Sequence, residues 1–297
     1  MRALAEFIMR GRMQATLVVA AAAALPMLFW LSAAAGSLVL LRRGLSDALS
    51  ILVWALLPAL VWWYFGEPRT LLVLLGTLGL ALVLRTSAAW SRVLLLSVGL
   101  GVIYSQVLGS LFGELIAATV SEIQALLPKV LEGMYEQMSV AEQAKLDSLL
   151  APVLVGLMAA VLQVVTLLSL LLGRYWQAQL YNPGGFGREF RTLRLPAPLA
   201  IGLLLVMLVA PNFGVQLAVL MPLCSVPLAF AGLALLHGLV TQGKLGRFWL
   251  VGLYVSLLLF MQLVFPLLVM LAVVDSLIDF RGRLAPKNGA GPANGEG

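Results

Sequence analysis

The sequence predicts an all-α polytopic membrane protein: a transmembrane helical bundle of eight or nine segments with an amphipathic extracytoplasmic helical loop. Hydrophobic residues fill 62% of the 297 positions, charged residues only 11%, and the mean hydropathy is +1.03. A soluble domain carries about 25% charged residues, so this chain has too few charges to cover a water-exposed surface. Composition therefore excludes a water-soluble enzyme. We also expect no nucleic-acid partner, because a net charge of +6 also arises when basic residues gather on the cytoplasmic side of a membrane.

Apolar runs bounded by charged residues give the predicted spans, since about 20 apolar residues cross a hydrocarbon layer about 30 Å thick. The run 15–41 is uncharged but contains Pro26, so we expect two short helices that form a hairpin there. The other predicted spans are 45–63, 71–84, 93–113, 149–172, 198–209, 215–239 and 248–274. The predicted regions are N-terminal transmembrane helices in 1–113, an acidic loop in 114–148, C-terminal transmembrane helices in 149–280 with a cytoplasmic loop at 174–197, and a disordered tail in 281–297.

Basic residues alternate with the spans as they do in a bacterial inner-membrane protein whose N-terminus is cytoplasmic. The last run would leave Arg281 and Arg283 outside, unless it folds back at Pro266 or another boundary is misplaced. The residues predicted to be cytoplasmic are Arg2, Arg10, Arg12, Arg42, Arg43, Arg85, Arg92, Arg174, Arg188, Arg191, Arg194, Lys244 and Arg247.

The acidic loop contains two sequences typical of capping boxes, Thr119-Val-Ser-Glu122 and Ser139-Val-Ala-Glu142. Apolar residues between them recur at helical spacing, which predicts two amphipathic helices on the outer membrane surface. These helices would either cover the bundle or form a lid over an outward-facing cavity.

Small residues recur every four positions along one predicted helix and form a narrow ridge that lets another backbone approach. The ridge serves either packing within the chain or docking of a membrane-protein partner. A second small-residue surface includes Ala20 and Ala24 with 33–36, and it is a candidate docking face for a coupling subunit. The ridge consists of Ser97, Gly101, Ser105, Gly109 and Gly113, continuing to Ala117.

Neutral polar residues inside the spans are candidates for binding a small, largely apolar ligand. The alternative is hydrogen bonding between helices, worth about 0.6 kcal/mol for each bond. The two ionisable candidates near span ends are His237 and Asp275. The candidate ligand-binding residues are Tyr104, Gln106, Gln163, Tyr254 and Gln262.

Motifs that carry enzyme chemistry are absent from the sequence, including HExxH, Walker and GxSxG patterns. One histidine and one cysteine cannot form a His-rich or CxxC metal site. We therefore expect neither an enzyme nor a cofactor nor a metal site.

The loop at 181–194 combines an Asn-Pro-Gly-Gly turn with three regularly spaced arginines. Arg188, Arg191 and Arg194 would share one face of a helix that contacts anionic lipid headgroups. The alternative is binding of a nucleotide phosphate, although the spacing matches no phosphate loop.

Three segments together resemble the YybS-like family of uncharacterised bacterial inner-membrane proteins: Leu40-Leu-Arg-Arg-Gly44, the run Asn-Pro-Gly-Gly-Phe-Gly-Arg-Glu-Phe in 182–190, and Asp275-Ser-Leu-Ile-Asp-Phe-Arg281. That family is distantly similar to the substrate-binding S components of energy-coupling-factor transporters. The resemblance implies capture of a small molecule for uptake. The chain departs from the S-component pattern in its greater number of segments and its long acidic loop. The alternative function is a non-catalytic scaffold or assembly factor for other membrane proteins.

Overall fold

A computed structural model describes residues 2–131, 133–243, 245–246 and 248–284, and every regular element in these ranges is a helix. Lys244, Arg247 and residues 285–297 of the predicted tail lie outside the described residues. The helices are α1 (Arg2–Arg10), α2 (Arg12–Ala24), α3 (Phe29–Arg43), α4 (Leu45–Tyr64), α5 (Arg69–Ser87), α6 (Trp90–Leu111), α7 (Gly113–Val130), α8 (Met134–Gln137), α9 (Val140–Tyr181), α10 (Gly185–Thr192), α11 (Ala197–Phe213), the 3₁₀ helix η1 (Val215–Val219), α12 (Leu220–Thr241), α13 (Phe248–Leu259), α14 (Met261–Ile278) and α15 (Phe280–Leu284).

Several of these helices have the length and composition of membrane spans, as expected of a multi-pass membrane protein. Six described helices are long and apolar enough to cross a membrane, or seven if α10 and α11, which meet at 63°, count as one bent span. The predicted eight or nine segments are therefore not confirmed. The difference arises at short helices, since α2 has 13 residues and α13 has 12.

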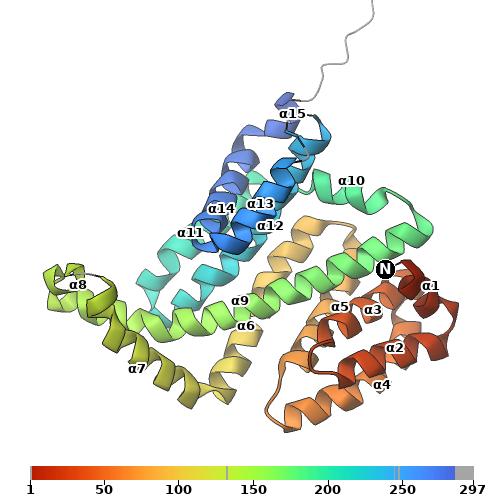
Figure 1. Cartoon of the computed structure of the whole chain (residues 1–297), viewed down its shortest axis with the longest axis horizontal. Helices are drawn as coiled ribbons and strands as arrows, with labels where there is room; N and C mark the ends of the chain where they lie inside the picture. The colour runs from red at the N-terminus through yellow and green to blue at the C-terminus, as the bar shows by residue number, and fades with distance from the viewer. Residues whose placement is uncertain (1, 132, 244, 247, 285–297) are drawn as a thin grey trace, which may run out of the picture.

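Helix α9 forms the centre of the molecule. Its 42 residues correspond to about 60 Å, and α3, α5, α6 and α12 pack against it. Figure 1 shows α9 crossing the molecule, with α1–α5 on one side and α11–α15 on the other. Small residues allow the close contacts: a Cβ atom at Gly173 would lie 2.8 Å from the carbonyl oxygen of Ala34 in α3.

The chain reverses direction at two apolar turns. The predicted break near Pro26 is confirmed, because α2 ends at Ala24 and α3 begins at Phe29. The second reversal is at Phe260, between α13 and α14, whereas Pro266 lies inside α14. Helix α14 then runs beside α12, and a Cβ atom at Gly232 would lie 2.3 Å from the Leu268 carbonyl oxygen. The last run therefore folds back, but at Phe260 and not at Pro266, so the predicted position of the reversal is wrong.

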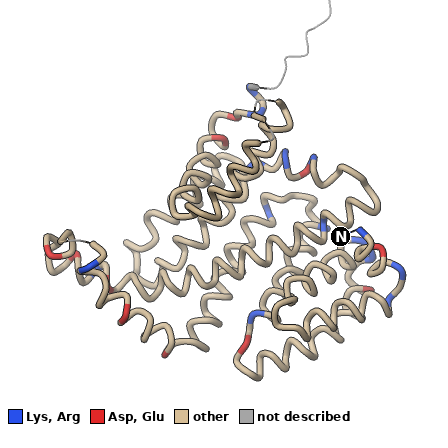
Figure 2. Tube along the Cα trace, viewed as in Figure 1, with Lys and Arg blue, Asp and Glu red and all other residues tan. Residues whose placement is uncertain are grey.

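Hydrogen bonds bring arginines from distant parts of the sequence to one end of the helices, which we call the arginine-rich end. Arg85 donates to the carbonyl oxygens of Leu40 and Leu41, at 2.7 and 3.1 Å. Arg281 donates to the carbonyl oxygen of Arg191 at 2.7 Å. Figure 2 shows basic residues near α1, α10 and α15, and acidic residues along α7 and α8.

The acidic segment differs from its prediction in one of the two capping boxes. Ser139 and Glu142 form the predicted capping box at the start of α9. Thr119 lies inside α7, and its hydroxyl donates to the Leu115 carbonyl oxygen at 2.9 Å, so it caps no helix. Helix α7 buries only Ile116 among its residues. The segment therefore forms an arm beside the bundle rather than part of its core (Figure 1).

Candidate functional site

An arginine-lined pocket opens at the arginine-rich end, where α10, α12, α14 and α15 meet. Its volume is about 440 Å³. The side chains come from segments about 40 to 90 residues apart, so the fold rather than local sequence assembles the pocket. The lining residues are Arg188, Arg191, Thr192, Arg194, Gly238, Thr241, Gln242, Asp279 and Arg281.

A buried ion pair lies behind the pocket, and its arginine, Arg281, is part of the lining. Asp275 is 2% exposed and Arg281 is 9% exposed, and the distance from Nη2 of Arg281 to Oδ2 of Asp275 is 2.8 Å. Nη1 of Arg281 also donates to the Leu193 carbonyl oxygen at 2.9 Å, and the amide of Phe280 donates to Oδ1 of Asp275 at 3.1 Å. Both buried charges are thus paired and hydrogen-bonded, as charges out of water require.

A left-handed residue explains how Arg281 reaches Asp275. Helix α14 ends at Ile278, and Asp279 has a φ of +56°, which turns the chain into α15. The turn places Arg281 back against the end of α14. Residues 281–284 are therefore helical, and the predicted disordered tail does not begin at Arg281.

Arg194 bonds to the end of α14 and lies beyond the helix that carries Arg188 and Arg191. Its Nε and Nη2 donate to the carbonyl oxygens of Asp275 and Ser276, at 3.2 and 3.0 Å. Its Nη1 lies 3.2 Å from Oδ2 of Asp279. Because α10 ends at Thr192, Arg194 does not continue a helix face with the two preceding arginines, and that part of the prediction is wrong.

Arg188 and Arg191 lie on the open side of the pocket. Arg191 donates through Nε to the Gly187 carbonyl oxygen at 2.7 Å and through Nη1 to Oγ1 of Thr241 at 3.1 Å. Arg188 is exposed, and its guanidinium makes no hydrogen bond or ion pair within the part of the chain that the structure describes. The neighbouring Glu189 instead pairs with Arg174.

The balance of charge gives the pocket its chemical character. Four arginines face two carboxylates, those of Asp275 and Asp279, which leaves an excess of two positive charges. Guanidinium groups present donors in a planar fork that matches the oxygens of phosphate and carboxylate. The arrangement is therefore that of an anion site, with hydroxyl and amide groups of Thr241 and Gln242 beside the cations.

The five predicted ligand-binding residues lie in different surroundings. The buried Tyr104 hydroxyl lies 3.0 Å from Oγ1 of Thr166 and donates to the Leu72 carbonyl oxygen at 3.0 Å. Gln163 is also buried and donates to Oγ of Ser97 at 2.9 Å. These contacts are hydrogen bonds between helices, the alternative interpretation. The other three are exposed: Gln106, Gln262, and Tyr254, whose hydroxyl lies 2.8 Å from Nε2 of His237.

The small-residue ridge divides between two helices because α6 ends at Leu111. Its first three members are buried, and a Cβ atom at Gly101 would lie 2.6 Å from Cδ2 of Leu223 in α12. Gly109 is half-buried and Gly113 is exposed. The buried part of the ridge, Ser97, Gly101 and Ser105, therefore packs against other helices of the same chain. On the second surface, Ala20 is half-buried and Ala24 exposed, while residues 33–36 are buried.

Sequence reasoning identified Asp275, Arg188 and Arg191 but missed Arg281, Asp279 and the end of α12. A buried carboxylate needs a cation, so asking which arginine could reach Asp275 would have pointed to the nearby Arg281. No local sequence pattern could have identified Thr241 and Gln242 as pocket residues, because only the tertiary fold brings them there.

Neither family models, curated proteins nor solved structures give a significant match to this chain. The resemblance to the YybS-like family therefore stays a prediction from the three sequence segments.

Proposed function

We propose that this multi-pass membrane protein binds a phosphate-bearing anion in the arginine-lined pocket, and that it acts by binding rather than by catalysis. The supporting observation is that the inner arginines are held by carboxylates and carbonyl groups, whereas Arg188 and part of Arg191 still have donors to offer. The framework is thus formed before any ligand arrives, so little ordering of the inner arginines opposes binding.

A lipid headgroup and a soluble phosphate compound present the same chemistry to these arginines. The lipid was the sequence prediction, and the position of the pocket at the ends of α12 and α14 suits it. The S-component-like uptake role called for an outward cavity, and the residues predicted to line it lie in separate surroundings. The geometry therefore favours binding at the arginine-rich end over capture from outside.

The proposal can be tested with purified full-length protein and two probes, inorganic pyrophosphate and phosphatidylglycerol in detergent micelles. We expect the double variant Arg188→Gln/Arg191→Gln to lose at least tenfold in affinity for the probe that binds. Arg92→Gln, which removes an exposed arginine outside the pocket lining, is the matched control.

Binding of pyrophosphate would identify a soluble ligand, and binding of phosphatidylglycerol alone would identify a lipid headgroup. Either result supports the anion site. Binding of neither probe, or equal losses in the control and the double variant, would overturn it.

A second candidate function, a scaffold for other membrane proteins, rests on the α7 arm. Leu115, Leu126 and Val130 of this helix are exposed, although it lies outside the bundle core. Such an amphipathic helix suits either the membrane surface or a partner. Crosslinking from a cysteine at Leu126 in native membranes tests the idea, and products that contain only this chain would count against it.

A further inference from the structure

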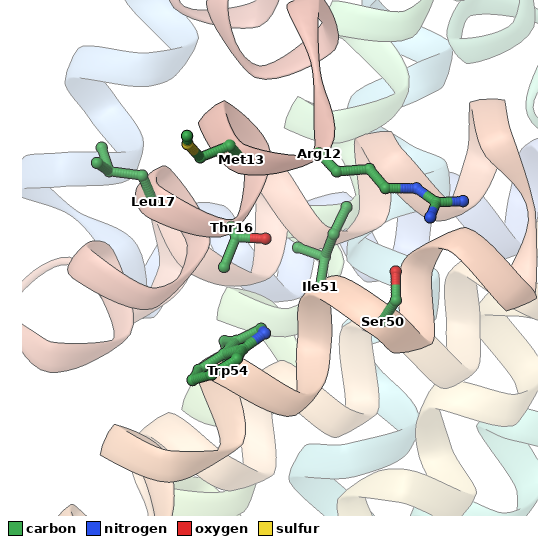
Figure 3. Close-up of a pocket in the computed structure, with 7 residues that line it drawn as sticks. All are labelled: Arg12, Met13, Thr16, Leu17, Ser50, Ile51 and Trp54. Carbon is green, nitrogen blue, oxygen red and sulfur yellow. The ribbon is translucent and has the colours of Figure 1, made fainter.

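A groove between α2 and α4 is separate from the arginine-lined pocket and shares no residue with it. Its volume is about 480 Å³. Figure 3 shows Arg12 and Ser50 at one end and Leu17 and Trp54 toward the other, so the groove has a polar end and an apolar end. The lining residues are Arg12, Met13, Thr16, Leu17, Ser50, Ile51 and Trp54.

The α2–α3 hairpin is too short to cross a membrane, which determines what the groove faces. The 13 residues of α2 correspond to about 20 Å, against a hydrocarbon layer of about 30 Å. The turn at 25–28 reads Leu-Pro-Met-Leu, with Leu25 52% and Met27 80% exposed. By contrast, the turn between α4 and α5 contains Glu67, which pairs with Arg69 at the start of α5.

Polar groups at the tip of the hairpin form hydrogen bonds within the turn and so do not depend on water. Nε1 of Trp30 donates to the Met27 carbonyl oxygen at 3.0 Å, and the Leu28 amide donates to the Leu25 carbonyl oxygen at 3.0 Å. Backbone groups in hydrocarbon need such internal partners. A hairpin this short with an apolar, internally bonded tip would end within the membrane, and the groove beside α2 would then open toward lipid.

The polar end of the groove contains Arg12, and the carboxylate of Asp47 lies next to Arg12, just outside the groove lining. Nη2 of Arg12 lies 2.6 Å from Oδ1 of Asp47, and the two side chains are 67% and 28% exposed. A guanidinium has five N–H donors, so Arg12 has others to offer to a phosphate. Oδ2 of Asp47 has no hydrogen-bond partner among the described residues, because Arg12 contacts Oδ1 and Ser50 donates to the Asp47 backbone carbonyl oxygen, so Oδ2 can accept from an ammonium.

The apolar end continues the groove along the helices. Met13, Leu17 and Trp54 are exposed there, and buried Ile51 lies beneath them. Trp54 follows Asp47 by seven residues, or about 10 Å along α4. An acyl chain that begins at the polar end would therefore lie along these side chains and bury apolar surface.

We infer that this groove binds a membrane phospholipid with a phosphoethanolamine headgroup. The phosphate would contact Arg12, the ammonium would contact Asp47, and one acyl chain would follow Leu17 and Trp54. The negative phosphate then faces the positive Arg12, and the positive ammonium faces the negative Asp47. A trimethylammonium headgroup lacks N–H donors for Asp47, and a glycerol headgroup lacks the positive charge.

Native mass spectrometry of the full-length protein in detergent tests this inference. The double variant Arg188→Gln/Arg191→Gln, in which the proposed anion pocket does not contribute, is titrated with phosphatidylethanolamine, phosphatidylcholine and phosphatidylglycerol that have identical acyl chains, and the Arg12, Asp47 and Arg69 substitutions are made in the same background. We expect phosphatidylethanolamine to bind at least fivefold more tightly than the other two, and Arg12→Gln to remove most of this binding. Asp47→Asn is expected to abolish the preference for phosphatidylethanolamine over phosphatidylglycerol.

Arg69→Gln is the matched control, because Arg69 is also an exposed arginine paired with a carboxylate, Glu67, at 2.6 Å, but it lines no described groove. Equal affinities of the Arg12 and Arg69 variants, or equal binding of phosphatidylethanolamine and phosphatidylcholine, would overturn the inference. Because the titration is made in the Arg188→Gln/Arg191→Gln background, a preference for phosphatidylethanolamine that persists there belongs to the groove and not to the proposed anion pocket.

Discussion

The two groups of helices on either side of α9 use arginine in different ways. In the N-terminal group, Arg85 donates to the carbonyl oxygens of Leu40 and Leu41, and Arg43 donates to that of Met9 at 2.8 Å. The carboxylates that pair with arginines in this group are not buried: Arg2 pairs with Glu6, Arg12 with Asp47 and Arg69 with Glu67. In the C-terminal group, Arg281 combines carbonyl acceptors with a buried carboxylate, that of Asp275. Both arrangements satisfy carbonyl groups near helix ends, where a cation is favourable.

The difference determines which group can form a ligand pocket. Where a single arginine donates to the carbonyl groups at a helix end, that end is capped and forms no pocket. Two carboxylates at the end of α14 draw Arg194 and Arg281 inward and hold them, which places Arg188 and Arg191 around a cavity rather than on carbonyls of a helix end. The buried carboxylate of Asp275, and not the presence of arginines alone, therefore distinguishes the pocket from the rest of the arginine-rich end.

The largest expected effect follows from breaking the buried pair. Arg281→Met leaves the Asp275 carboxylate buried without its cation, and we expect it to lower the free energy of unfolding by about 3–5 kcal/mol. Unfolding by SDS in mixed micelles measures this change. The double variant Arg281→Met/Asp275→Leu should recover much of the loss, since it leaves no buried charge. Equal losses in the single and double variants would show that the pair contributes only packing.

Two glycines test whether both groups depend on equally close backbone packing. A Cβ atom at Gly173 would contact α3, and one at Gly232 would lie 2.3 Å from a backbone oxygen of α14. Alanine at either position should lower the free energy of unfolding by about 1–3 kcal/mol, because backbone rather than a flexible side chain must move. Gly79→Ala is the control, since its Cβ atom would meet nothing within 4 Å among the described residues. Equal stability of all three variants would contradict the close packing.

A smaller effect is expected from removing the arginine that caps the N-terminal group. Arg85→Leu deprives the Leu40 and Leu41 carbonyl groups of a donor, which should cost about 1 kcal/mol in the same unfolding assay. The loss is smaller than for Arg281 because no buried charge remains and Arg85 lies near solvent. A loss as large as that of Arg281→Met would remove the distinction between the two groups.

The sequence predicted features that depend on local chemistry and failed where distant segments meet. Pro26 and the flanking apolar runs sufficed to predict the α2–α3 hairpin, and Ser139 with Glu142 predicted the start of α9. Thr119 has the same capping pattern but lies within α7, because the helix continues from Gly113 through that position. Hydropathy does not separate spanning helices from short ones, so the predicted count of eight or nine segments is not confirmed by the six or seven helices of sufficient length.

The pocket, too, could not be predicted where it depends on contacts between distant segments. Regular spacing suggested one helix face for three arginines, but spacing carries no information about where α10 ends, and Arg194 was assigned to lipid rather than to the end of α14. Asp275 was recognisable because a carboxylate at the end of an apolar run is costly and therefore conspicuous. Its partner Arg281 fell in a segment expected to be disordered, because composition alone does not show a turn such as that at Asp279.

The smallest effect on stability separates arginines that build the pocket from those that face a ligand. Arg188→Gln should change the free energy of unfolding by less than about 0.5 kcal/mol, because the side chain is exposed and bonds no described residue. The ligand should reveal the difference: an anion present at 100 times its dissociation constant stabilises the native chain by about 2.7 kcal/mol. This gain should fall in Arg188→Gln and persist in Arg92→Gln. If Arg188→Gln were instead as destabilising as Arg281→Met without ligand, Arg188 would belong to the framework, and the open side of the pocket would have to lie elsewhere.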